Sequence, residues 1–133
     1  MIQYETRFSV RYHETDQMKF VHHSNYIVWF EMGRIGLMDS VGISYAELEN
    51  EGYLLPVLEA GARYLKPARF GDKLTMKTRI PEMPRAKIKF EYQIFNADKV
   101  LLCSGFSLHS FMNRNERAIK PPKIFFHKLK DFF

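Results

Sequence analysis

The sequence of 133 residues has one cysteine, no apolar run long enough to cross a bilayer and no internal repeat. Because Cys103 is alone, no disulfide can form within the chain, and its neighbours Leu101 and Leu102 indicate a buried thiol rather than a nucleophile. A membrane-spanning helix needs about 20 apolar residues, so we expect no stable membrane insertion. The first residues also lack the basic and then apolar pattern of a secretion signal, which favours a cytoplasmic protein.

A basic tract and a nucleic-acid-binding motif are absent too, although the formal net charge is +5. The Lys and Arg residues are spread along the chain, so we expect no nucleic-acid partner. Dispersed positive charge is better suited to the phosphates of a small carrier molecule. The length and the 46% hydrophobic content fit one compact core, and we therefore predict a single domain over residues 1–133.

Periodicity predicts one long helix and about five strands. Residues 24–38 are apolar on nearly every side, which predicts a helix buried on most sides, and its Gly33 and Gly36 indicate close approach to another backbone. The capping-box spacing from Ser44 predicts a short helix that runs to Glu51. Alternating apolar and polar residues predict strands over 2–12, 73–80 and 87–94, and we also predict strands over 54–66 and 99–112.

The last predicted strand, 99–112, is apolar or small on both faces, so we expect it to be central or at an interface. The tail, 122–133, predicts a short helix that packs on its own sheet or frays, with contact to a membrane surface as the less favoured reading. Together these elements predict an α+β fold in which the sheet wraps around the long helix.

The segment before the long helix carries a carboxylate, Asp16. The first N–H groups of a helix have no internal partner, and the helix dipole makes that end electropositive. If the helix begins near His23 or Ser24, these N–H groups can face the oxygen of an acyl group while Asp16 approaches its carbon. A helix cap or turn is the other common use of such an aspartate.

A metal site is the sharper alternative for this segment. His13, His22 and His23 lie close to Asp16 in the sequence. Their spacing matches no familiar ligand pattern, so we predict no metal.

Residues 12–26, which read YHETDQMKFVHHSNY, resemble the active-site signature of the hotdog-fold acyl-CoA thioesterases of the 4-hydroxybenzoyl-CoA thioesterase (YbgC-like) family. The resemblance covers nearly the whole chain. It implies an antiparallel sheet of about five strands wrapped around one long central helix. It also implies an enzyme that hydrolyses an acyl-CoA to free acid and coenzyme A without a cofactor, and a homodimer or homotetramer with the site at the subunit boundary.

The resemblance also implies residue roles. Asp16 is the implied nucleophile or general base, and His23 the implied catalytic side chain. The backbone N–H groups of His23 and Ser24 are the implied oxyanion donors. Lys19 stands where the family usually has glycine, a residue that tolerates backbone angles which lysine adopts less easily. The candidates for substrate binding are Tyr12, Asn25, Tyr26, Glu59, Arg85 and Lys87.

Several alternatives stay open at this point. Glu59 lies in an apolar strand and is either a buried acid paired with Arg63, which we favour, or a second catalytic carboxylate. The acyl donor can be coenzyme A or an acyl carrier protein. A hydratase or dehydratase that acts on acyl thioesters, and a protein that binds acyl-CoA or an acyl carrier without catalysis, are the other functions considered.

Overall fold

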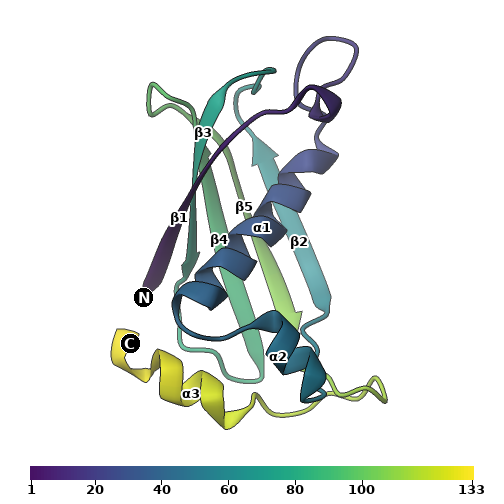
Figure 1. The fold of residues 1–133 in the computed structure, drawn as a ribbon, viewed down its shortest axis with the longest axis vertical. Coiled ribbons are helices and arrows are strands. Elements are labelled where there is room, and N and C mark those ends of the chain that lie inside the picture. The colour runs from purple at the N-terminus through teal and green to yellow at the C-terminus, as the bar shows by residue number, and fades with distance from the viewer.

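The computed structural model, which describes residues 1–133, contains one five-stranded antiparallel sheet in the order β1-β3-β4-β5-β2 (Figure 1). The helices are α1 (Ser24–Ser40), α2 (Tyr45–Asn50) and α3 (Lys123–Leu129), and the two short 3-10 helices are η1 (Tyr12–Glu14) and η2 (Lys130–Phe132). The strands are β1 (Ile2–Ser9), β2 (Val57–Tyr64), β3 (Lys73–Ile80), β4 (Lys87–Phe95) and β5 (Leu101–Ser110). Each predicted helix and strand is therefore present.

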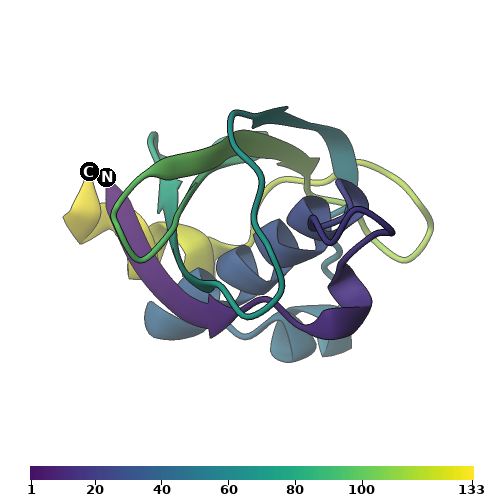
Figure 2. The same cartoon turned by 90° about the horizontal axis from the view of Figure 1, so that it is seen from above.

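The sheet curves around α1, as the view from above shows (Figure 2). Alternation along β3 sends Leu74 and Met76 into the core and leaves Lys73 and Arg79 on the outer face. β5 lies between β4 and β2, which confirms that the strand with two apolar faces is central. The α+β prediction, a sheet wrapped around one long helix, is confirmed.

One face of α1 packs on the sheet and the other does not. Trp29, Phe30 and Leu37 are buried against the strands. The opposite face remains apolar but is 37–55% exposed, and its members are Ile27, Val28, Met32 and Ile35. The prediction that α1 is buried on most sides is wrong for the single chain, because the sheet covers only one side of the helix.

The two glycines of α1 allow close contact with the sheet. A Cβ atom at Gly33 would lie 2.3 Å from Thr78 Oγ1, and one at Gly36 would lie 2.7 Å from the Tyr4 ring. Close approach is therefore confirmed, but the groups approached are side chains of β3 and β1 rather than another backbone.

The ends of the chain differ in part from the prediction. β1 stops at Ser9 instead of residue 12, because Val10 donates its N–H to Asp72 O and the chain then turns into η1. In the tail, α3 buries Phe125 and Leu129 and packs Phe125 edge-on against Phe111 at 5.0 Å. The tail therefore packs on its own core, and no helix of the chain is long and apolar enough to cross a membrane.

Candidate active site

The loop that leads into α1 is anchored by Glu14, a carboxylate only 2% exposed. Its Oε1 accepts the Arg11 backbone N–H at 2.7 Å, and its Oε2 accepts the Trp29 indole N–H at 2.8 Å and the Arg11 guanidinium at 3.3 Å. Burial acts to raise the pKa of Glu14, but these donors outweigh burial and hold the pKa below its ordinary value. Glu14 therefore stays charged and fastens η1 to α1.

Asp16 closes the next turn of the loop with one of its two carboxylate oxygens. Oδ1 accepts the Met18 N–H at 2.8 Å and the Phe20 N–H at 3.3 Å. Oδ2 has no donor within the chain. The turn also requires one residue in the left-handed backbone conformation. Lys19 adopts this conformation, with φ of 66°, although glycine adopts it more freely. Asp16 thus combines a turn role with one free oxygen.

The start of α1 leaves one backbone N–H unused. Ser24 N–H donates to His22 Nδ1 at 3.2 Å, and Asn25 N–H donates to His22 O at 3.0 Å. The N–H of His23, which caps the helix, has no acceptor in the chain. At the electropositive end of a 17-residue helix, this N–H is a ready donor for an anionic oxygen.

Asp16 and His23 line the same surface pocket, which has a volume of about 400 Å³. Tyr26 and Tyr64 form an aromatic wall, with ring centroids 5.1 Å apart. Tyr26 is buried, and its hydroxyl accepts the Ala68 N–H at 3.4 Å. Lys66 adds one cation to the pocket lining. The residues that carry the free carboxylate oxygen and the free N–H therefore line one pocket, beside an aromatic wall.

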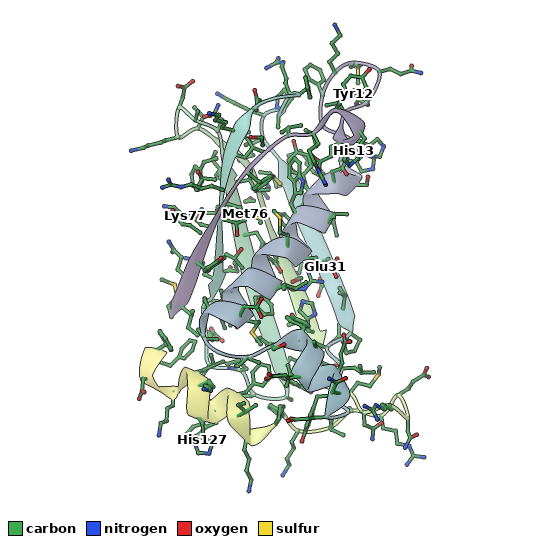
Figure 3. The ribbon with its side chains drawn as sticks, in the orientation of Figure 1. Tyr12, His13, Glu31, Met76, Lys77 and His127 are labelled. Atoms are coloured by element: carbon green, nitrogen blue, oxygen red, sulfur yellow. The ribbon has the colours of Figure 1, made fainter.

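Of the six predicted substrate-binding residues, only Tyr26 lines this pocket. Asn25 is part of the scaffold, because its side-chain amide donates to Glu14 O at 2.9 Å and to His22 O at 3.3 Å. Tyr12 is 77% exposed and packs edge-on against Phe70. Figure 3 shows Tyr12 and His13, both in η1, at the end of the molecule where α1 begins. No three His, Cys, Asp or Glu side chains converge to form a metal site.

The environment of Glu59 differs from the prediction of a buried acid paired with Arg63. Glu59 is exposed on the edge strand β2, and no ion pair joins it to Arg63. Strand alternation sends Glu59 to the face of the sheet opposite to Tyr64 and the pocket. The prediction of a buried paired acid is wrong because β2 has a neighbour on one side only and leaves its side chains in solvent.

Arg85 and Lys87 lie at the other end of the sheet from Asp16. Arg85 is in the turn between β3 and β4, and Lys87 begins β4. The strands run the length of the molecule between this turn and the loop of Asp16, a span of about 25 Å for eight residues (Figure 1). One chain therefore does not bring these cations to its own pocket.

Comparisons with known proteins identify the superfamily of this chain. The model of the thioesterase-like superfamily matches residues 10–129. The chain belongs to this superfamily. It is 38% identical to YneP of Bacillus subtilis (strain 168), named as a candidate acyl-CoA thioesterase, over 84% of the chain and 80% of that protein. A DHNA-CoA thioesterase from Staphylococcus aureus superposes with a TM-score of 0.94 at 27% identity, covering 99% of this chain and 91% of that one.

A third relative carries a different acyl donor in its name. The chloroplastic acyl-acyl carrier protein thioesterase ATL3 of Arabidopsis thaliana is 29% identical over 97% of this chain and 68% of that protein. Together with the hotdog fold, the superfamily assigns this chain to the thioester hydrolases. The predicted thioesterase superfamily and enzyme class are therefore confirmed.

Three residues that shape the site were not foreseen as functional from the sequence: Glu14, His22 as the acceptor of the Ser24 N–H, and Tyr64. The sequence contains no local pattern that reveals the partner of Glu14, because Trp29 follows 15 residues later. Tyr64 reaches the start of α1 from a strand 41 residues away. Only the folded arrangement brings these groups together.

Proposed function

We propose that this thioesterase hydrolyses acyl-CoA thioesters in the pocket formed by Asp16 and His23. The observation that carries the proposal is the pairing of one free carboxylate oxygen on Asp16 with the unused N–H of His23 in one pocket. Coenzyme A as the carrier is supported by the names of relatives. Lys66 in the pocket lining suits the phosphates of that carrier.

The chemistry follows from these two groups. Asp16 acts on the carbonyl carbon, either as the nucleophile or by removing a proton from an attacking water. The carbonyl oxygen becomes an anion, which the N–H of His23 and the dipole of α1 stabilise. The C–S bond then breaks, and the thiolate of coenzyme A leaves and takes up a proton. In the nucleophilic route, water hydrolyses the resulting anhydride and restores Asp16.

The direct test compares Asp16→Asn with the unaltered chain on a panel of short, long and aromatic acyl-CoAs. We expect thiol release to fall by about 10³, because loss of a positioned base or nucleophile typically costs 10²–10⁴. Asp72→Asn is the matched control, since Asp72 also accepts a backbone N–H in a turn but does not line the pocket. Equal activity of Asp16→Asn and the unaltered chain would contradict the proposed role.

An acyl carrier protein is a second candidate for the donor. The observation that favours it is the likeness to ATL3 over nearly the whole chain. Rates measured with the same acyl group on coenzyme A and on a carrier protein distinguish the two donors. The superfamily assignment favours hydrolysis over the hydratase and the non-catalytic alternatives.

We also propose that the chain works as a dimer joined through the edge of β2, which has no neighbour on one side. The exposed apolar face of α1 supports burial by a second copy. Antiparallel pairing of two β2 strands would bring the partner's Arg85 and Lys87 to the same end of the joined sheet as Asp16. Sedimentation tests the dimer, and a monomer that hydrolyses thioesters at the full rate would contradict it.

A further inference from the structure

Tyr64, the last residue of β2, stands over the start of α1. Its hydroxyl donates to the backbone oxygen of His23 at 3.2 Å. Its ring packs edge-on against Tyr26 at 5.1 Å and against the His23 ring at 6.3 Å. The side chain is 48% exposed and forms part of the pocket wall. One hydrogen bond thus joins the edge strand to the residue that carries the unused N–H.

The two peptide groups on either side of His23 differ in how many of their polar atoms are hydrogen-bonded. In the peptide between His23 and Ser24, the oxygen accepts from Tyr64 and from the Tyr26 N–H at 3.3 Å, and the N–H donates to His22 Nδ1 at 3.2 Å. In the preceding peptide, the His22 oxygen accepts from Asn25, but the His23 N–H has no partner. The hydrogen bonds on both sides therefore fix the orientation of the one group left free.

We propose that Tyr64 is a positioning residue, which holds His23 through its carbonyl so that the His23 N–H stays directed at the oxygen of a bound thioester. The inference rests on the proposed function, because it gives Tyr64 a role in the same oxyanion site.

Two features make Tyr64 important for this position. His23 has helical angles, φ of −55° and ψ of −30°, and no side-chain cap of its own, so the cap residue depends on outside contacts. Burial also raises the pKa of the Tyr64 phenol, which therefore keeps its proton and remains a donor at neutral pH. A donor that is fixed before the reaction stabilises a developing charge without reorganisation.

Tyr64→Phe removes the hydroxyl and keeps the ring. We expect kcat for acyl-CoA hydrolysis to fall about tenfold, because a displaced oxyanion donor loses only part of the 10²–10³ that complete removal of a donor typically costs. KM should stay within about twofold and the melting temperature within about 2 °C, because the packing of the ring is unchanged. Tyr53→Phe is the matched control, because Tyr53 is half-buried, makes no side-chain hydrogen bond in the chain and does not line the pocket.

Four results would overturn the inference. An unchanged kcat would mean that the hydroxyl has no effect on the donor. A raised KM with unchanged kcat would make Tyr64 a contact for substrate binding. A drop in kcat well beyond a hundredfold would make Tyr64 a catalytic residue in direct contact with the reacting group. A Tyr64→Phe protein that melts much earlier, with kcat lowered only in proportion to the folded fraction, would make its role structural.

A measurement without substrate separates this inference from the proposed function. We expect the backbone amides of Ser24 and Tyr26 to exchange hydrogen faster in Tyr64→Phe than in the unaltered chain, because both flank the released carbonyl. Unchanged exchange would contradict the positioning role whatever the activity is. Faster exchange in a chain that hydrolyses no acyl thioester would contradict the proposed function and leave the contact of Tyr64 with His23 established.

Discussion

Polar groups near the N-terminal end of α1 have unused hydrogen-bonding capacity, whereas a buried set below its C-terminal half is hydrogen-bonded within the core. At the N-terminal end, the loop over residues 12–23 leaves hydrogen-bonding capacity open, since Asp16 keeps a free carboxylate oxygen and His23 an unused N–H. Glu14 supplies the rigidity there, because all its contacts serve to hold the loop on α1. Open hydrogen-bonding capacity and structural support are therefore divided between two carboxylates two residues apart.

Below the C-terminal half of α1, a buried hydrogen-bond network lies inside the core. The Tyr92 hydroxyl lies 2.6 Å from Ser107 Oγ, which lies 2.8 Å from His109 Nε2, and His109 Nδ1 faces the Leu55 carbonyl at 3.3 Å. His109 is fully buried. Because Nδ1 must donate to a carbonyl, Nε2 accepts from Ser107, and Tyr92 donates to Ser107. Every side chain in this network has its hydrogen-bond partner inside the protein.

The difference indicates where function can reside. Both ends contain titratable groups that are held by hydrogen bonds, but only the N-terminal end offers a carboxylate oxygen and an N–H to an incoming molecule. Burial, together with a smaller effect of nearby Arg34, lowers the pKa of His109 to about 4, so this imidazole is neutral at pH 7 and unavailable to solvent. The C-terminal end of α1 therefore serves stability.

Glu14→Gln is expected to have the largest effect on stability and tests whether Glu14 anchors the loop. An amide cannot accept from the Arg11 N–H, the Arg11 guanidinium and the Trp29 indole together, so we expect the free energy of unfolding to fall by about 3 kcal/mol. Urea denaturation at pH 7 measures this loss. Asp16→Asn should cost less than about 1 kcal/mol, because its turn oxygen still accepts two N–H groups.

Glu5→Gln is the matched surface control for Glu14. Glu5 is exposed, and its contact with Arg7 is long at 3.9 Å, so we expect a change within about 0.5 kcal/mol. If Glu14→Gln were no more costly than Glu5→Gln, the buried carboxylate would not anchor the loop, and the separation between support and chemistry would fail.

The fold was largely predictable because apolar periodicity reports which faces are buried. The alternation along residues 73–80 and 87–94 gave both strands, and the capping box at Ser44 gave α2, whose N-cap hydroxyl accepts the Glu47 N–H at 3.4 Å. Periodicity does not show what covers an apolar face, however. It therefore predicted a covered α1, although one side of that helix is exposed in the single chain.

The site was predictable only where it is local in sequence. The placement of Asp16 just before a helix start predicts a carboxylate near free N–H groups, and both line one pocket. Contacts between distant segments could not be predicted, which is why Glu14 and Tyr64 were missed. Glu59 was misread for a related reason, because an apolar sequence does not distinguish a central strand from an edge strand.

A smaller effect is expected from acid at the C-terminal end of α1. The ordinary pKa of histidine is 6.5, whereas that of folded His109 is about 4, so between these values the unfolded chain binds more protons than the folded one. Unfolding free energy therefore falls as pH falls from 6.5 towards 4, by about 2 kcal/mol at pH 5 relative to pH 7. Glu14, whose pKa is lowered from 4.5, loses its contribution only at still lower pH.

Urea denaturation at pH 7 and pH 5 measures this loss, and His109→Gln should remove most of the difference between the two pH values even if it lowers stability at both. His127→Gln is the matched control, because His127 is exposed on α3 and should leave the pH dependence unchanged. The same slope in His109→Gln and in the unaltered chain would show that the buried hydrogen-bond network does not set acid stability.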